Sequence, residues 1–363
     1  MHEKLFIHAT NVHQGGGRTL LDALLKLSFR QDTTVLLDER MPIPEAMPSG
    51  TRLIRTKASL LGRLHAERLL ATQAKSGDTV LCFGNLPPLF TVAGRVIVFV
   101  QNRYLIDQVS LGQFSFKSRL RLSLERTWFR MRAASVDEYV VQTPSMKQAL
   151  AHHLANIKTK PGLEIRILPF VSGGSRHSRA HTIAVHETQK RHDFVYVGSG
   201  EPHKNHRNLI NAWILLAQAN CYPSLALTVD AAAFPDLCKW IDEQIRIHRL
   251  HIENKGALHQ SGVTDLYSCS AALIYPSTLE SFGLPLIEAR NAGLAVLAGE
   301  LDYVRDILDP EESFDPQSAV SIARAVKRFR RMEEPALSIV DARIFVDSLA
   351  PGPESNSTSA PFR

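Results

Sequence analysis

Two glutamates eight residues apart, Glu280 and Glu288, have the surroundings that most clearly indicate chemistry in this sequence of 363 residues. An apolar run that ends at Tyr275 predicts a buried strand, and Pro285 predicts a helix that begins at about that position. Glu280 would then lie in a loop at the carboxyl end of a strand, where α/β proteins bind ligands. Gly283 would let the backbone approach a ligand, and the free amides of the helix would bind an anion such as a diphosphate.

A lysine in a second strand–loop–helix unit is placed to bind the same anion. The segment 194–197 predicts a strand, Gly198 and Ser199 follow it, and Lys204 comes just before the next expected helix. A cation there can make a charge-assisted contact with a phosphate. Taken alone, both motifs have a simpler explanation, because a solvated glutamate or lysine is common at the start of a helix.

Together these two segments resemble the family 4 retaining glycosyltransferases, which have the glycosyltransferase B fold. The segment 276–289, PSTLESFGLPLIEA, is similar to the E-x7-E element of that family, and the segment 198–210, GSGEPHKNHRNLI, is similar to its glycine loop, lysine–asparagine pair and helix. The resemblance covers most of 194–309 firmly and 4–168 loosely. It implies an α/β protein with two Rossmann-like domains that face each other across a cleft.

The resemblance also implies roles for individual residues. Glu280 and Lys204 are expected to be catalytic, with the carboxylate orienting the donor sugar and stabilising positive charge on its ring, and the lysine holding the diphosphate. Glu288 is expected to bind the ribose, and a turn after a strand is expected to contact the base through its main chain. The expected donor-binding set is Glu288, Ser281, Phe282, Gly283, Leu284, Gly198, Ser199, Gly256 and Ala257.

One of these positions departs from the family pattern. Ser199 stands where relatives usually have an arginine that shares the diphosphate with the lysine. The loss of one charge-assisted phosphate contact weakens binding by about 1.5–3 kcal/mol without abolishing it. Arg207 and Lys255 are the cations that could compensate.

The first half of the chain is expected to bind the acceptor. Gly15, Gly16 and Gly17 follow the first expected strand and allow close backbone approach, and they resemble the glycine-rich first loop of the same family, although a simple tight turn is the alternative. Gln101 and Asn102 end another strand where many relatives have a histidine. Neither can act as a general base, so we expect them to bind sugar hydroxyls. A retaining enzyme tolerates this, because the leaving phosphate assists deprotonation of the acceptor.

A basic amphipathic helix is expected over Lys117–Arg132, with six cations and one glutamate. Its apolar stripe of Leu120, Leu124, Trp128 and Met131 is expected to pack on the core. The alternative is docking on an anionic inner-membrane surface, or holding a lipid-diphosphate acceptor. The net charge of +6 fits an anionic partner, but no nucleic-acid-binding motif accompanies it.

Short β-branched runs alternate with longer amphipathic stretches through both halves of the chain, which predicts two parallel sheets covered by helices. The expected strands are 5–9, 34–37, 52–55, 79–83, 96–100, 138–141, 165–168, 194–197, 225–229, 251–254, 272–275 and 295–297. The expected helices are 18–29, 60–75, 118–134, 144–156, 205–219, 234–248, 264–268, 285–292 and 316–331, with Thr143 as a helix N-cap. We therefore expect an acceptor-binding domain over 1–172, a linker over 173–192, a nucleotide-sugar-binding domain over 193–335, and a C-terminal helix and disordered tail over 336–363.

The function expected from these features is transfer of a hexosyl or deoxyhexosyl group from a nucleotide diphosphate sugar to a glycan acceptor. The stretches at 199–206 and 101–105 are similar to bacterial surface-polysaccharide and O-antigen transferases, so we expect a lipid-linked acceptor and a role in lipopolysaccharide biosynthesis. The alternatives are a catalytically degenerate scaffold of a glycan-assembly complex and a sugar-nucleotide epimerase. No apolar run reaches the ~18 residues of a membrane span, so a cytoplasmic or peripheral inner-membrane location is expected. Scattered histidines and cysteines suggest neither a metal nor a cofactor.

Overall fold

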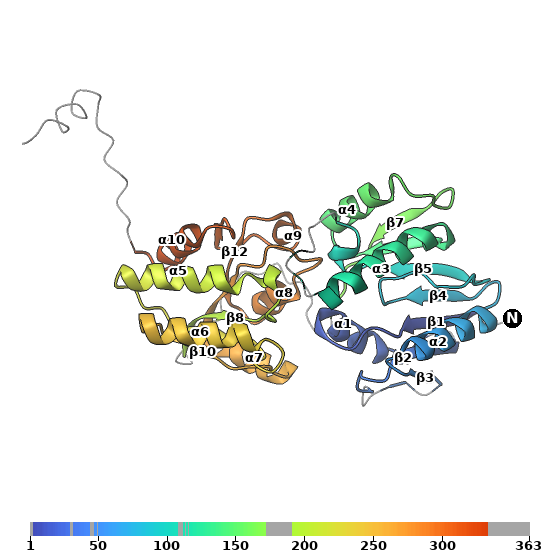
Figure 1. Cartoon of the computed structure of the whole chain (residues 1–363), viewed down its shortest axis with the longest axis horizontal. Helices are drawn as coiled ribbons and strands as arrows, with labels where there is room; N and C mark the ends of the chain where they lie inside the picture. Colours follow the sequence, from blue (N-terminus) through green and yellow to red (C-terminus); the bar gives the residue numbers. More distant parts are fainter. Residues whose placement is uncertain are drawn as a thin grey trace, which may run out of the picture.

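The structure, a computed structural model, describes residues 3–29, 32–43, 47–48, 50–107, 112, 114, 116–171 and 191–332. Two parallel β-sheets lie side by side, one from each half of the chain (Figure 1). Each sheet carries helices on both faces, as the alternation of short apolar runs and amphipathic stretches predicted. The predicted α/β architecture is therefore confirmed.

The N-terminal sheet has seven strands in the order β3-β2-β1-β4-β5-β6-β7. Its strands are β1 (Lys4–Ala9), β2 (Asp32–Asp38), β3 (Arg52–Thr56), β4 (Thr79–Cys82), β5 (Arg95–Phe99), β6 (Glu138–Val141) and β7 (Glu164–Ile167). Its helices are α1 (Gly15–Leu25), α2 (Leu60–Gln73), α3 (Phe116–Arg132) and α4 (Pro144–Leu154), with 3₁₀ turns η1 (Arg103–Leu105) and η2 (Ala133–Ser135). The strand order reverses between β1 and β4, and the loops that follow two such strands diverge and leave a crevice for a ligand.

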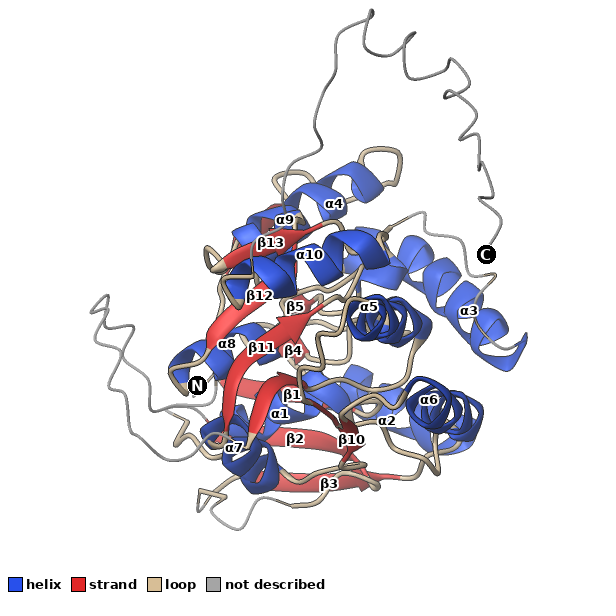
Figure 2. Ribbon diagram, turned by 90° about the vertical axis from the view of Figure 1, so that its left-hand side faces the viewer, coloured by secondary structure: helices blue, strands red, loops and turns tan. Residues whose placement is uncertain are grey.

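The C-terminal sheet has six strands in the order β10-β9-β8-β11-β12-β13. Its strands are β8 (His192–Tyr196), β9 (Leu225–Leu227), β10 (Ile252–Asn254), β11 (Ser270–Tyr275), β12 (Ala295–Gly299) and β13 (Glu312–Phe314). Its helices are η3 (Pro202–Lys204), α5 (His206–Gln218), α6 (Pro235–His248), α7 (Gln260–Ser268), α8 (Leu284–Asn291), α9 (Asp302–Arg305) and α10 (Ala319–Phe329). In Figure 2, α7 and α8 lie on one side of the sheet, and α5 and α6 on the other. The order reverses between β8 and β11, so the loops with Lys204 and Glu280 follow neighbouring strands.

The structure differs from the predicted elements in a few places. The strand β13 and the short helix α9 were not predicted, because each has only three or four residues and no apolar run. Helix α7 begins at Gln260, four residues before the predicted start, and His192 belongs to β8 and not to the predicted linker. The rest of that linker, apart from Arg191, and the predicted C-terminal helix and tail lie outside the described residues. Among the helices that the structure does describe, none is long and apolar enough to cross a bilayer.

The two domains meet where α1 and α4 face α8 and α9 (Figure 1). The backbone amide of Ser145, in the first turn of α4, donates to the Asp306 carboxylate at the end of α9, with a distance of 2.9 Å. Leu284 at the start of α8 packs against the apolar core of the N-terminal domain. The carboxyl ends of both sets of strands therefore face one crevice.

The N-cap of α4 provides a test of the local fold beside this contact. The Thr143 hydroxyl accepts a hydrogen bond from the amide of Met146 at 3.2 Å. We expect Thr143→Ala to lower the free energy of unfolding by about 1 kcal/mol, because one amide of the first turn loses its acceptor. Thr143→Ser keeps the hydroxyl and should stay close to wild type in denaturant unfolding. Equal stability of the alanine and serine variants would contradict the capping role.

Candidate active site

A cavity of about 280 Å³ lies between the two domains. It is lined by Asn11, Val12, Gln14, Gly17, Asn85, Gln101, Asn102, Arg103 and Tyr104 from the N-terminal domain, and by His203, Leu279, Glu280 and Ser281 from the C-terminal domain. Most of these residues belong to loops that follow β1, β4, β5, β8 and β11. The cavity thus occupies the switch points of both sheets, where the topology predicts a ligand.

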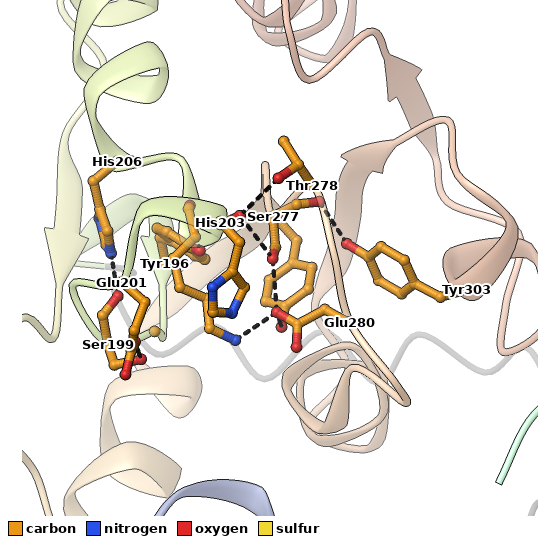
Figure 3. Close-up of polar contacts among 12 residues, drawn as sticks. Tyr196, Ser199, Glu201, His203, His206, Ser277, Thr278, Glu280 and Tyr303 are labelled. Carbon is orange, nitrogen blue, oxygen red and sulfur yellow. Dashed lines mark hydrogen bonds and ion pairs between the residues drawn. The ribbon is translucent and has the colours of Figure 1, made fainter. Parts of the chain in front are cut away.

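Glu280 is the charged centre of this cavity. One carboxylate oxygen, Oε1, accepts hydrogen bonds from Lys204 Nζ at 2.5 Å, Ser277 Oγ at 2.7 Å and Tyr275 Oη at 2.9 Å (Figure 3). No described residue donates to the other oxygen, Oε2. Burial disfavours the charged form, but the Lys204 ammonium and the hydroxyl donors outweigh it and hold the pKa of Glu280 below its usual value. The side chain is therefore a fixed anion at neutral pH with one oxygen left for a ligand.

Three buried tyrosines hold the loops that carry this ion pair. The hydroxyl of Tyr196 donates to the carbonyl of Lys204 at 2.7 Å, and that of Tyr303 donates to the carbonyl of Ser277 at 2.8 Å (Figure 3). Burial and the nearby Glu280 carboxylate raise the pKa of these phenols and of Tyr275 well above the usual value. All three hydroxyls consequently stay protonated and act as donors.

The turn before Lys204 is joined directly to the loop before α8. The carbonyl of His203 accepts hydrogen bonds from the Thr278 amide at 2.8 Å and from the hydroxyls of Ser277 and Thr278 at 3.2 Å (Figure 3). Asn205, which adopts the left-handed conformation with φ 61°, donates from its side chain to the carbonyl of Pro276 at 3.1 Å. These bonds fix Lys204 opposite Glu280 even though the two residues are 76 positions apart.

Helix α8 begins as the sequence predicted, with Gly283 in the left-handed conformation at its N-cap and a proline in its first turn. A β-carbon at position 283 would lie 3.0 Å from Leu286 Cδ1, so glycine also fits the space there. No side chain caps the helix. Its first amides therefore point outward uncapped and form the positive end of the helix dipole.

The structure brings only part of the predicted donor set to the cavity. Ser281 of that set and the predicted catalytic Glu280 line it, whereas the predicted catalytic Lys204 and the donor-set residues Gly198, Ser199, Gly256, Ala257, Phe282, Gly283, Leu284 and Glu288 are not among its lining residues. Glu288 faces α7, where it accepts from Gln260 Nε2 at 3.2 Å and from Tyr267 Oη at 3.4 Å. Burial raises the pKa of Glu288 despite these two donors. The pKa of Glu280 is thus lowered, whereas the pKa of Glu288 is raised.

Both predicted compensating cations have other partners in this structure. The guanidinium of Arg207 lies over the ring of Trp240, 4.5 Å from its centroid, and Lys255 Nζ pairs with Glu253 at 2.5 Å. The hydroxyl of Ser199 donates to the carboxylate of Glu201, so an acid, and not a base, follows the glycine loop. Compensation by either cation would therefore require it to leave its present partner.

In the N-terminal domain, Gly15–Gly17 form the first turn of α1, three residues before the predicted helix start. Gly17 lines the cavity, and a β-carbon at Gly16 would lie 3.2 Å from Leu284 Cδ1. Glycine at position 16 thus allows α1 to approach α8 across the domain boundary. Both helices start at the cavity edge without a side-chain cap.

Gln101 and Asn102 line the cavity, where Asn85 holds their backbone. Both of their amides donate to Asn85 Oδ1, at 2.5 and 2.8 Å. Gln101 Nε2 donates to the carbonyl of Phe83 at 3.1 Å, and Asn102 Oδ1 accepts from the amide of Tyr104 at 3.0 Å. In each side chain, one polar group is therefore hydrogen-bonded within the N-terminal domain.

Sequence reasoning missed a pair of rings that close the cavity from both domains. Tyr104 and His203 meet edge to face, with ring centroids 5.4 Å apart. Burial, with the carboxylates of Glu280 and Glu201 nearby, raises the pKa of Tyr104 to about 12, and burial beside Lys204 lowers the pKa of His203. Both rings are therefore neutral near pH 7. Arg103, which pairs with Asp107 at 2.5 Å, is a further lining cation that was not predicted.

The predicted packing of α3 is wrong for three of the four residues of its stripe, and only Trp128 packs against the core. Leu120, Leu124 and Met131 are exposed, with 52%, 63% and 74% of their surface accessible. Leu122 and Phe129 pack on the core instead. The prediction chose the wrong apolar face because this helix has two.

Comparison with solved structures identifies the class of fold. HepE of Anabaena, solved in complex with UDP and glucose, matches with a TM-score of 0.61 at 16% identity over 91% of this chain and 92% of that chain. WaaG, a glycosyltransferase involved in lipopolysaccharide biosynthesis, matches with a TM-score of 0.60 at 17% identity over 90% of both chains. The chain therefore has the glycosyltransferase B fold.

Residues 179–342 match the family model described as glycosyl transferases group 1. The chain is 25% identical over 114 residues to O-antigen chain mannosyltransferase B of Escherichia coli, which covers 31% of this chain and 30% of the relative. It is 28% identical over 132 residues to the serotype-specific mannosyltransferase WbdA of Escherichia coli, 35% of this chain and 16% of the relative. The chain matches less than a third of either relative's length. The predicted resemblance to bacterial polysaccharide transferases is confirmed.

The ion pair at the centre of the site has a measurable effect on stability. Because the pKa of Glu280 is lowered, the pair stabilises the fold at pH values above the usual carboxylate pKa of 4.5 and this contribution is lost as the pH falls through the lowered pKa. We expect Lys204→Met to cost about 3 kcal/mol at pH 7, since it leaves a buried carboxylate unpaired. The difference from wild type should shrink as the pH falls, because without Lys204 burial raises the pKa of Glu280 and the unpaired carboxylate takes up a proton.

Unfolding free energies measured from pH 4 to pH 7 test this expectation. The double variant Lys204→Met/Glu280→Gln is the matched control, because it removes both charges and should recover much of the lost stability. A pH-independent loss in Lys204→Met would contradict the role of the ion pair.

Proposed function

We propose that this chain is a retaining glycosyltransferase that transfers a hexosyl or deoxyhexosyl group from a nucleotide diphosphate sugar. The observation that carries the proposal is the Glu280 carboxylate, which is held anionic by Lys204 and offers one oxygen to a cavity between two Rossmann-like domains. A fixed anion of this kind stabilises the positive charge that develops on a sugar ring as its bond to phosphate breaks. The mannosyltransferase relatives and the HepE complex with UDP and glucose support this class of donor.

The diphosphate of the donor would bind between Lys204 and the first amides of α8. These groups are positive or partly positive, they come from adjacent loops, and no side chain caps the helix. The uncapped start of α1 faces the same edge of the cavity. Glu288 and the turn at Gly256–Ala257 would then receive the ribose and the base. Because these groups would balance the negative charge of the diphosphate, we propose that no metal ion is required.

Reaction with retention fits the residues that line the cavity. The acceptor hydroxyl oxygen bonds to the anomeric carbon as the bond from that carbon to the leaving phosphate oxygen breaks, and the hydroxyl proton passes to the leaving phosphate. No side chain needs to take that proton, which suits a cavity lined by the amides of Gln101 and Asn102. Their remaining polar groups would bind hydroxyls of the acceptor.

We propose that the acceptor is a glycan on a lipid carrier in the assembly of a surface polysaccharide. The relative named O-antigen chain mannosyltransferase B and the similarity to WaaG support this assignment. The opposite proposal, a degenerate scaffold, has one observation in its favour, namely the Ser199–Glu201 contact where a cation is usual. Two experiments separate the two proposals.

The first experiment removes the charge of Glu280. We expect Glu280→Gln to lower kcat by about 10²–10³ while the fold stays intact, because the amide has no charge to stabilise the donor sugar. The measurement is release of nucleoside diphosphate from a panel of nucleotide sugars with soluble glycan acceptors. Glu300→Gln, an exposed glutamate paired with Arg305, is the matched control and should be fully active. Wild-type turnover by Glu280→Gln would exclude the assignment.

The second experiment restores the missing cation. We expect Ser199→Arg to tighten donor binding by about 10-fold or more, since one charge-assisted contact with phosphate contributes about 1.5–3 kcal/mol. Calorimetry with the nucleoside diphosphate product gives the dissociation constant directly. Ser199→Gln is the uncharged control of similar length and should bind like wild type. If neither wild type nor Ser199→Arg binds any nucleoside diphosphate, the scaffold proposal is favoured.

A further inference from the structure

The helix α3 has two apolar faces, of which only one packs on the protein. Leu122 and Phe129 belong to the core of the N-terminal domain. The opposite face carries Phe116, Leu120, Leu124 and Met131, with 72%, 52%, 63% and 74% of their surface exposed. Four large apolar side chains on the outside of one helix need an explanation, because scattered single exposures are the normal pattern.

Cations border this outer face on both sides. At 100° per residue, Phe116, Leu120, Leu124 and Met131 fall within an arc of about 80°. Lys117 and Arg121 lie next to one edge of that arc, and Arg119 and Arg130 lie next to the other. All four cations are exposed. An exposed apolar stripe with basic borders is the pattern of a helix that lies in a membrane interface.

A second pair of exposed apolar residues lies at the start of the neighbouring helix α2. Leu60 and Leu61 begin α2 and are 89% and 80% exposed, the two largest values among the large hydrophobic residues of the described chain. The helices α2 and α3 are neighbours, because the guanidinium of Arg63 lies 4.7 Å from the ring centroid of Trp128. Lys57, just before α2, is also exposed.

We propose that this α2–α3 surface docks on an anionic lipid bilayer. The surface consists of six apolar residues, Leu60, Leu61, Phe116, Leu120, Leu124 and Met131, and of five cations, Lys57, Lys117, Arg119, Arg121 and Arg130. The apolar side chains insert at the boundary of headgroups and acyl chains, and the cations bind the anionic headgroups. A bilayer is favoured over a protein partner by this charge arrangement, since basic residues flank the apolar arc of α3 on both sides.

The α2–α3 surface is connected to the cavity through Arg126 of α3. Arg126 of α3 donates from Nε to the carbonyl of Tyr104 at 2.8 Å, and from Nη2 to the carbonyl of Asp107 at 2.8 Å. Tyr104 lines the cavity. A bilayer against α3 would therefore lie beside the acceptor side of the site, where it could present a lipid-borne acceptor. Only this last link rests on the proposed function.

The test is co-sedimentation of the full chain with vesicles, without donor or acceptor. We expect binding to vesicles of phosphatidylcholine with about one-third phosphatidylglycerol, and little binding to phosphatidylcholine alone. Each cation close to the surface contributes about a factor of five, so Arg119→Gln/Arg130→Gln should lower the partition coefficient by about 30-fold. Leu120→Ser/Leu124→Ser should lower it at least tenfold, because two apolar side chains no longer insert.

Matched controls use exposed residues of the other domain. Ile247→Ser/Val320→Ser removes two exposed apolar side chains, and Lys239→Gln/Arg246→Gln removes two exposed cations of α6. Both controls should bind anionic vesicles like wild type. All of these side chains are exposed, so each variant should unfold at the wild-type temperature.

Three outcomes would overturn the proposal. One is failure of the wild-type chain to bind anionic vesicles. Another is equal loss of binding in the α3 variants and the controls. The third is self-association, seen as a dimer in analytical ultracentrifugation that Leu120→Ser/Leu124→Ser converts to a monomer, which would assign the surface to a second copy of this chain. Transfer to soluble acceptors is measured without vesicles, so the proposed activity can fail or hold independently.

Discussion

The site depends on one carboxylate oxygen that three donors share. Glu280 Oε1 accepts hydrogen bonds from Lys204, Ser277 and Tyr275. These bonds connect two loops that are far apart in sequence. Because β8 and β11 are neighbours in the sheet, these loops start side by side, and the hydrogen bonds to the His203 carbonyl complete their alignment. The second carboxylate oxygen is then fixed in direction before any ligand arrives. Such preorganisation avoids a reorganisation cost at the moment of reaction.

A second constraint is how closely the two domains approach each other. Two helices begin at the cavity edge, and a side chain at Gly16 would press on Leu284. Glycine there lets α1 pack against α8, so the positive ends of both helices face the same region. The amide of Ser145 and the Asp306 carboxylate provide a polar contact beside this apolar one. The N-terminal domain therefore contributes both a helix start and side chains to the region of the cavity.

Much of this arrangement could be predicted from local sequence patterns. The strand before Glu280, the left-handed glycine at 283 and the proline-initiated α8 each depend on a few adjacent residues, and all of them agree with the structure. The ring pair of Tyr104 and His203 could not be predicted, because it joins residues about 100 positions apart through the docking of two domains. The outer face of α3 was misjudged for a related reason. Periodicity detects an apolar stripe, but it cannot show which of two stripes faces the core.

At Ser199, the proposed donor site lacks the cation that relatives usually have, and the two predicted compensating cations already have partners. Arg207 is held over Trp240, and Lys255 is paired with Glu253, so neither is available without losing an existing contact. A diphosphate at α8 would instead depend on Lys204 and on two helix ends, whose partial charges are fixed by the backbone and cannot be lost by substitution. Lys204 would also have to serve both Glu280 and the phosphate. That sharing would have a cost, because a diphosphate at Lys204 would place a second anion close to the Glu280 carboxylate.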